Sequence, residues 1–266
     1  MTTEVIYAAN IIREIQALES QHVTETVEKT AIVDKIKQLH LIIRDVAIKY
    51  HKNGRVKIEE WHIKNSGVVS RAGAPAVVIY YDDGIVNEEN WYENWYDEGK
   101  LHRPGGAPAV TRYYKDGTVF TQEWYEHGKE HRVGAPHCIT YHRNGNTKKE
   151  EWCTDGKEHR VDGPAIVSYY EDGKICSEAW YINGQRHRDH EPASTAYYKS
   201  GNVKTHQWYI HGIEHRDGGV PEYVNYYENG TIEEEWKYKN GELQYIDKYD
   251  ECGNIVLRIN KLPRYY

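Results

Sequence analysis

The stretch from Gly163 to Arg188 reads GPAIVSYYEDGKICSEAWYINGQRHR, and the same frame of residues recurs along most of the chain. Successive tryptophans of this frame lie 28 residues apart, since 152 − 124 = 28 and each later pair gives the same difference. A fixed period of this length is typical of proteins in which each copy packs only against its neighbours. The repeated tryptophans are Trp124, Trp152, Trp180, Trp208 and Trp236. The paired-aromatic step of the frame, such as Tyr169-Tyr170, occurs six times and once more in a weaker form at Tyr50-His51, so the sequence predicts about seven repeats.

One repeat is predicted to contain about three short strands and two tight turns. β-Branched and aromatic residues favour a strand from Ala165 to Tyr170, and the Asp172-Gly173 step provides a glycine that can reverse the chain. We expect a second strand from Lys174 to Ile182, then a hairpin turn at Asn183-Gly184 and a short third strand. Because so small a repeat cannot cover its own apolar face, stacked copies should form an elongated, twisted antiparallel sheet with Tyr and Trp ladders.

Composition agrees with a thin sheet and limits the choice of partners. The chain has 24 Tyr and 8 Trp but one Phe and one Met, so its large side chains mostly carry a polar group. With 41 acidic and 34 basic residues, the formal net charge is -7. An acidic chain is a poor match for phosphate backbones or anionic membranes, so we expect no nucleic-acid partner and do not favour peripheral membrane contact.

Four cysteines, Cys138, Cys153, Cys176 and Cys252, show no CxxC pair and fall at unrelated repeat positions. This pattern predicts neither a zinc site nor a disulfide framework, and favours free thiols in an intracellular, reducing compartment. The apolar window from Ile32 to Ile48 is interrupted by charges, and no signal peptide is recognisable. We therefore expect a protein that is not secreted and has no transmembrane segment.

Residues 1–43 differ in kind from the rest and are predicted to form a short α-helical N-terminal arm. Apolar residues recur there at the three-and-four spacing of one helix face; they are Val5, Ala8, Ile12, Ile15, Ile32, Ile36, Leu39 and Ile43. Residues 44–266 form the predicted β-repeat domain, whose last repeat is a degenerate cap ending in a strand from Ile255 to Ile259. The arm either covers the open end of the first repeat or docks a partner.

A His-Arg pair closes each repeat and is the main candidate site. The pairs are His102-Arg103, His131-Arg132, His159-Arg160, His187-Arg188 and His215-Arg216. A row of imidazoles and guanidiniums could bind a metal, a lipid headgroup or another small ligand. Alternatively, each pair holds the junction between repeats, with His bonded to turn backbone and Arg to a carboxylate beside each Trp, such as Glu151. Repetition in every copy favours the architectural role.

The clearest insertion runs from Asn87 to Lys100 and duplicates the Trp-Tyr step. It contains Trp91, Tyr92, Trp95 and Tyr96. Aromatic loops that interrupt a repeat are frequent sites of partner contact. These four residues are therefore candidate contacts with a protein partner.

The run His159-Arg160-Val161-Asp162-Gly163-Pro164-Ala165, followed by Trp180-Tyr181-Ile182-Asn183-Gly184, resembles a variant of MORN-type repeats. This variant, His-Arg-x-Asp-Gly-Pro-Ala, is familiar from giant double-stranded DNA viruses and some bacteriophages. The resemblance covers roughly residues 44 to 260, although Ser70-Arg71 replaces His-Arg in the first repeat. It implies a MORN-like β-ribbon acting as a scaffold or adaptor, in the virion or in the cytoplasm of an infected host cell.

The sequence shows no nucleophile motif and no phosphate-binding glycine loop, and its Asp-Gly steps lack the ligand spacing of a calcium loop. We therefore expect a non-enzymatic protein without cofactor or metal. Its predicted function is that of a scaffold in protein–protein interaction, with other virion proteins or copies of itself as partners. The alternative is a module that binds lipid or a small ligand through the His-Arg row.

Overall fold

The computed structural model describes residues 44–63, 74–92, 100–239 and 242–260. The chain divides into two compact parts, residues 1–117 and 118–266, which are treated separately below. In both parts the described residues are mainly β-strand, and no α-helix occurs among them. The predicted helical arm, residues 1–43, lies outside the described residues. Within the described ranges, no helix has the length and apolar character needed to cross a membrane.

The described residues of the N-terminal part form five strands, paired antiparallel in the order β1-β2-β3-β4-β5. The strands are β1 (Arg44–Tyr50), β2 (Val56–Ile63), β3 (Val77–Tyr80), β4 (Val86–Asn90) and β5 (Val110–Tyr113). A short 3-10 turn, η2 (Pro104–Gly106), precedes β5. Among the described residues, the first strand of this sheet starts at Arg44.

In the C-terminal part, eleven strands of the described residues form a sheet in the antiparallel order β6-β9-β10-β13-β14-β17-β18-β21-β22-β23-β24. They are β6 (Val119–Glu123), β9 (Cys138–Tyr141), β10 (Thr147–Glu151), β13 (Ile166–Tyr169), β14 (Ile175–Ala179), β17 (Ser194–Tyr197), β18 (Val203–Gln207), β21 (Tyr223–Tyr226), β22 (Ile232–Lys239), β23 (Glu242–Tyr249) and β24 (Ile255–Asn260). A 3-10 turn, η3 (Asp217–Gly219), precedes β21. The predicted closing strand corresponds to β24.

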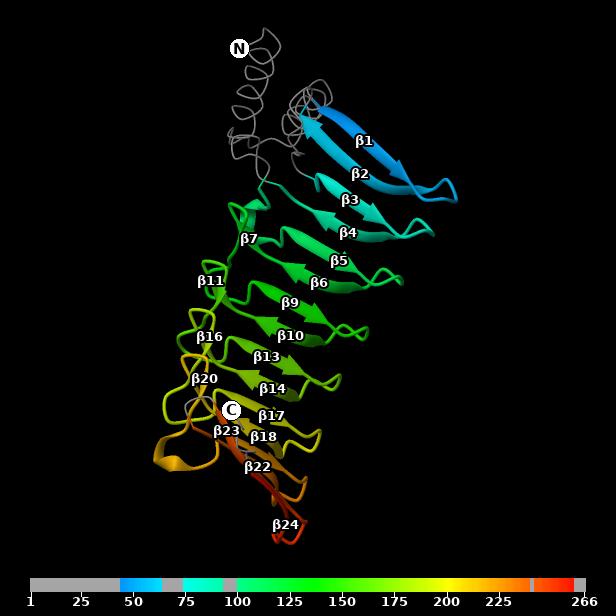
Figure 1. Ribbon diagram of the computed structural model, residues 1–266. Helices are drawn as coiled ribbons and strands as arrows, with labels where there is room; N and C mark the ends of the chain where they lie inside the picture. Colours follow the sequence, from blue (N-terminus) through cyan, green and yellow to red (C-terminus); the bar gives the residue numbers. More distant parts are fainter. Residues whose placement is uncertain (1–43, 64–73, 93–99, 240–241, 261–266) are drawn as a thin grey trace, which may run out of the picture. The chain divides into compact units, whose positions relative to one another are not determined.

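Short hairpins accompany this sheet and account for the rest of each repeat. They pair β7 (Tyr125–Glu126) with β8 (Lys129–Glu130), β11 (Cys153–Thr154) with β12 (Lys157–Glu158), β15 (Tyr181–Ile182) with β16 (Gln185–Arg186), and β19 (Tyr209–Ile210) with β20 (Ile213–Glu214). Figure 1 shows the large hairpins β9-β10, β13-β14 and β17-β18 side by side, with β11, β16 and β20 along one margin. One complete repeat thus contributes a large hairpin to the sheet and a small hairpin beside it.

The repeat has four strands rather than the predicted three, because the chain leaves the sheet at the tryptophan. The strand expected from Lys174 to Ile182 is split, with β14 ending at Ala179 and β15 beginning at Tyr181. Trp180 N–H donates to the carbonyl of Ala193 in the next repeat at 2.7 Å, and Trp180 O accepts from His187 N–H at 3.1 Å. These two bonds turn the peptide toward the small hairpin, so one continuous strand cannot form.

Both predicted turns are confirmed by their backbone angles. Gly173 has φ +84°, and its N–H donates to Tyr170 O at 3.0 Å, as in a tight turn that ends on a left-handed glycine. Asn183 and Gly184 have φ +51° and +80°. Two successive positive angles define the type I′ turn that suits a two-residue hairpin, and Asn-Gly is its preferred sequence.

The core is thin and consists mainly of small aliphatic residues, with Trp124 and Trp208 as its largest members. Ala165 and Ala193 have no exposed surface, and Val167 and Val224 are 4% and 2% exposed. These side chains lie at or next to the start of the first strand of each large hairpin. Large aromatic groups sit around them at the junctions between repeats, which agrees with the scarcity of Phe and Met in the sequence.

Tyrosine hydroxyls connect neighbouring large hairpins in a ladder. Tyr170 and Tyr198 each donate to the carbonyl of a tyrosine in the following repeat, Tyr197 and Tyr226, at 2.7 Å. Where histidine replaces the tyrosine, the contact persists, since His142 Nε2 lies 2.9 Å from the equivalent carbonyl. The polar atom at this position, rather than the ring type, is what every such junction shares.

We predict that Tyr198→Phe lowers the free energy of unfolding by about 1 kcal/mol, because the carbonyl of Tyr226 loses a donor while the packing stays the same. Urea unfolding followed by circular dichroism measures this change. Tyr50→Phe is the matched control, since Tyr50 is 60% exposed. Equal losses in the two variants would contradict the ladder.

Candidate functional site

The guanidinium of each His-Arg pair lies over the ring of the tryptophan of its own repeat. The guanidinium carbon is 3.8 Å from the ring centre for Arg103 on Trp91, Arg132 on Trp124 and Arg216 on Trp208, and 4.0 Å for Arg160 on Trp152 and Arg188 on Trp180. Each guanidinium also donates to the carbonyl of the proline four or five residues later, for instance Arg160 to Pro164 at 3.3 Å. The repeated Arg-Trp stack is therefore also bonded to the backbone that begins the next repeat.

The carboxylate expected beside each Trp is not the partner of the arginine. Glu151 pairs with Lys149 at 2.7 Å, and Glu123 accepts from the hydroxyl of Tyr125 at 3.1 Å. The indole face takes the place that a carboxylate was predicted to occupy. A planar guanidinium stacks well on an aromatic face and still offers its edge to a carbonyl, which a lysine cannot do.

Gly163, directly before Pro164, lies close to this stack. A Cβ built on Gly163 would lie 2.9 Å from the guanidinium carbon of Arg160, so in this repeat a side chain there would require the guanidinium to shift. Other repeats accommodate a side chain at this position, such as Ala135 and Glu191, and Glu191 forms an ion pair with Arg188. Arg188 keeps its place on Trp180, so the departure from the motif adds a partner and preserves the stack.

Two histidines of the row, His159 and His187, contact the small hairpin of the following repeat. His159 Nδ1 accepts from the backbone N–H of Asn183, and His187 Nδ1 accepts from that of His211, both at 3.2 Å. The rings of His187 and His211 also stack at 4.4 Å. In these two His-Arg pairs, the imidazole and the guanidinium are both engaged in contacts within the protein, so they are poorly placed to bind lipid or phosphate.

The Asn87–Lys100 insertion divides into two halves. Trp91 occupies the ordinary tryptophan position, because its N–H donates to Ala109 O at 2.7 Å and its ring carries Arg103. Tyr92 forms a bridge with Leu101, and burial raises the pKa of its hydroxyl. Trp91 and Tyr92 are therefore part of the repeat, and the extra pair, Trp95 and Tyr96, lies outside the described residues.

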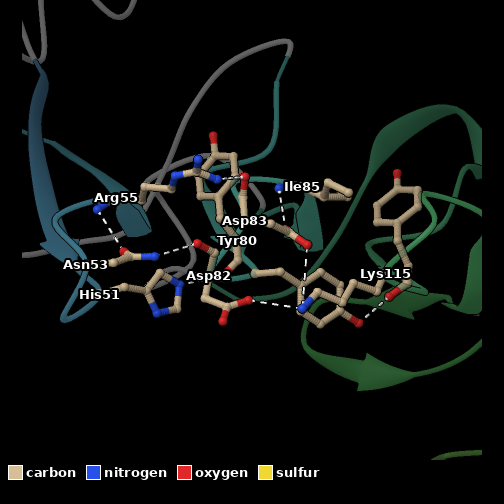
Figure 2. A network of polar contacts seen from close by, with 10 residues as sticks. His51, Asn53, Arg55, Tyr80, Asp82, Asp83, Ile85 and Lys115 are labelled. Carbon is tan, nitrogen blue, oxygen red and sulfur yellow. Dashed lines mark hydrogen bonds and ion pairs between the residues drawn. The ribbon is translucent and has the colours of Figure 1, made fainter.

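The tips of the large hairpins in the N-terminal part form a polar network (Figure 2). Asn53 donates to the carbonyl of Asp82 at 2.7 Å, and Lys115 lies 3.1 Å from Asp82 and 3.5 Å from Asp83. The Lys115 ammonium holds the pKa of Asp82 below its ordinary value. These carboxylates bond to neighbouring tips, as expected for turns rather than calcium loops.

The repeat pattern breaks at two positions that face each other. His137 stands where Ala165 stands one repeat later, since their carbonyls accept from Trp124 N–H and Trp152 N–H, both at 2.7 Å. Cys153 begins β11 directly after Trp152, as Tyr181 begins β15 directly after Trp180. A small buried alanine and a large tyrosine are thus replaced by an imidazole and a thiol.

A cavity of about 300 Å³ opens at this break. Its lining residues are Glu123, Glu130, His137, Cys138, Glu151, Cys153, Gly156 and Glu158. Cys153 Sγ donates to the backbone carbonyl of Glu130 at 2.9 Å, and His137 Nε2 lies 3.8 Å from Glu130 Oε2. Side-chain donor atoms of these three residues lie within 4.8 Å of one another, in a geometry open to a metal ion.

Sequence reasoning missed this cluster because its members are scattered over 24 residues and form no CxxC or His-x-Cys spacing. A usable signal was nevertheless present. His137 and Cys153 are the residues at which the repeat departs from its own pattern. Comparing each repeat with its neighbours would have marked both.

No family model and no curated protein matches this chain. Among solved structures, "Crystal Structure of TcdB2-TccC3" is 11% identical with a TM-score of 0.20, over 82% of this chain and 13% of that one. A second, "Crystal Structure of TcdB2-TccC3-Cdc42", is 14% identical with a TM-score of 0.16, over 81% and 12%. The chain thus spans about an eighth of the length of these structures, and so distant a likeness supports no functional conclusion.

We predict that Arg160→Lys destabilises the protein by about 1 kcal/mol, because it keeps the charge but loses the stack on Trp152. Arg160→Ala should cost about 1–2 kcal/mol, since the bond to Pro164 is lost as well. Urea unfolding gives both values, with the exposed residue Lys148, changed to Ala, as control. A neutral Arg160→Lys would show that charge, and not stacking, holds the junction.

We predict slow modification of the cavity thiols. Burial, together with nearby carboxylates, raises the pKa of Cys138 to about 12 and that of Cys153 to about 11. A raised thiol pKa means less thiolate at pH 8; for Cys153 the loss is about a hundredfold, and higher intrinsic nucleophilicity recovers about tenfold. Cys153 should therefore react with a disulfide reagent roughly ten times more slowly than an ordinary thiol.

Two variants test this, one retaining only Cys153 and the other only Cys252, which is exposed. In the folded protein, the Cys153 variant should react with the reagent more slowly than the Cys252 variant. In urea the two variants should react at the same rate, because neither thiol is buried in the unfolded chain. Equal rates in the folded state would show that the cavity does not shield its thiol.

Proposed function

We propose that this chain is a non-enzymatic repeat scaffold that mediates protein–protein interaction, and that its last strand, β24, is the docking edge. The repeated Arg-Trp stacks, His contacts and Tyr hydroxyls join one repeat to the next, which suits a rigid support. The motif resemblance to viral MORN-type repeats supports a place in the virion or in the cytoplasm of an infected cell. The occupied His-Arg row speaks against the lipid-binding alternative.

The observation that carries this proposal is the apolar surface of β24. Ile255, Val256, Leu257 and Ile259 are 54%, 62%, 46% and 46% exposed. Among the described residues, β24 has a neighbour on one side only, β23. An edge strand with exposed aliphatic side chains offers both backbone hydrogen-bonding groups and apolar area to an added strand.

The partner best suited to this edge is an extended, apolar segment of another protein. Arg258 forms an ion pair with Asp247, which is 3% exposed, and this pair anchors β24 to β23. The edge is thereby held in register, so a partner need not order it on binding. Alternate positions 255, 257 and 259 share one face, so a strand added alongside would extend this apolar face.

We predict that Leu257→Glu removes the protein partners of the chain while leaving it folded. Leu257 pairs across the sheet with Lys248, so the new carboxylate gains a cation on the neighbouring strand but introduces charge on the apolar edge. Capture of the tagged full-length chain from its native source, compared by mass spectrometry between variants, is the measurement.

Val161→Glu is the matched control, since Val161 is 79% exposed and lies in a turn between repeats. Wild type and Val161→Glu should retain the same proteins, and Leu257→Glu should lose them. Size-exclusion chromatography separates the case in which the lost partner is a second copy. Identical partners for all three chains would remove β24 from the proposal, and no protein partner with any of them would overturn the scaffold function.

A further inference from the structure

The two positions held by His137 and Cys153 recur with the same spacing in the other repeats. Ordinary repeats place a buried alanine and a tyrosine there, such as Ala165 and Tyr181, 16 residues apart as 137 and 153 are. The alanine position has no exposed surface in four repeats, at Ala76, Ala109, Ala165 and Ala193. Polar groups introduced at this pair are therefore forced to find partners inside the protein.

The last repeat shows how a polar side chain at the alanine position finds partners. Glu222 takes this position, since its carbonyl accepts from Trp208 N–H at 2.9 Å, and Tyr238 stands 16 residues later at the tyrosine position. Lys237 Nζ donates to Glu222 Oε1 at 2.7 Å, and Tyr238 N–H donates to Glu222 Oε2 at 2.7 Å. The residue at the second position thus contacts the side chain at the first, so the two positions lie next to each other in this repeat.

His137 is different, because not all of its polar atoms have hydrogen-bond partners. His137 is 9% exposed and lines the cavity, yet its Nδ1 is buried without a hydrogen-bond partner. Its Nε2 lies 3.8 Å from Glu130 Oε2, beyond hydrogen-bond distance. A buried imidazole nitrogen without a partner, beside a thiol and a carboxylate, is an exception that requires an explanation.

We propose that Glu130, His137 and Cys153 bind a divalent cation of the zinc class. Imidazole, thiolate and carboxylate together are the donors that Zn²⁺ prefers, whereas Ca²⁺ and Mg²⁺ prefer oxygen alone. The donor atoms lie within 4.8 Å of one another, close enough to converge on one ion after small side-chain movements. Glu158, which lines the same cavity, or a water molecule completes a tetrahedral set.

The charges around the cavity favour a cation. Four carboxylates line it, and neither Lys nor Arg is among the lining residues. Glu151 is paired with Lys149 and Glu123 accepts from Tyr125, so Glu130 and Glu158 are the carboxylates left to balance the ion. On binding, Cys153 releases its proton to solvent and forms a sulfur–metal bond, with no change of oxidation state.

The ion would clip two successive repeats together. Glu130 belongs to β8 and Cys153 to β11, the small hairpins of adjacent repeats, and His137 lies in the connection between them. Elsewhere this junction is held by backbone bonds, such as Gly184 N–H to Glu158 O at 2.9 Å. A metal bridge would make this one junction stiffer than its neighbours and dependent on metal supply.

Cobalt(II) binding to the full-length, reduced chain tests the site. We expect one Co²⁺ per chain, with the intense visible bands of tetrahedral coordination and a sulfur-to-metal charge-transfer band, both displaced by Zn²⁺. Cys153→Tyr and His137→Ala restore the residues of the ordinary repeat, so both variants should fold. Cys153→Tyr should abolish the charge-transfer band, and His137→Ala should weaken binding by at least roughly tenfold, the size of effect seen when even an outer-shell group is lost.

Cys176→Ser is the control, since Cys176 lies in β14 outside the cavity and its loss should leave the spectrum unchanged. Saturating Zn²⁺ should raise the melting temperature of wild type but not of Cys153→Tyr. A wild type without stoichiometric Co²⁺ binding, or a charge-transfer band that survives in Cys153→Tyr, would overturn the proposal. So would equal loss of binding in Cys176→Ser.

Discussion

The peptide group of the repeated tryptophan is the point on which the architecture depends. Its N–H reaches the next repeat and its carbonyl accepts from the small hairpin of its own repeat, as Trp180 does with Ala193 and His187. The ring then carries the arginine that is bonded to the proline preceding the next strand. One residue thus ends a strand, starts a hairpin and fixes the position of the following copy, so its spacing in the sequence sets the spacing of the hairpins.

The parts of this fold that depend on local sequence could be predicted from it. Asp172-Gly173 and Asn183-Gly184 require positive φ, and the structure has both. The break at Trp180 was missed because it comes from a hydrogen bond to the next repeat, and a continuous run of strand-forming residues carries no sign of it. The partner of Arg160 was missed for a related reason: a nearby carboxylate is visible in the sequence, whereas the approach of an indole face depends on the turn between them.

Repetition also hides information, because a pattern draws attention to what is shared. The His-Arg row was the natural candidate for chemistry, yet its contacts are the same structural ones from repeat to repeat. The informative residues are those that depart from the repeat pattern, such as the inserted Trp95, or His137 at the position of Ala165. Trp91 is not one of them. It is an ordinary repeat element, since it carries Arg103 as other tryptophans carry their arginines.

The facing pair of positions shows how a repeat acquires a specific property without losing its fold. Three versions occur: alanine with tyrosine, glutamate with tyrosine, and histidine with cysteine. In each, the tryptophan N–H bonds to the carbonyl of the first member whatever its side chain. A buried polar side chain there needs hydrogen-bond partners inside the protein, as Glu222 has in Lys237 and in the N–H of Tyr238. Where such a partner is missing, as for His137 Nδ1, the architecture tolerates the mismatch in a single junction because the neighbouring repeats hold their own.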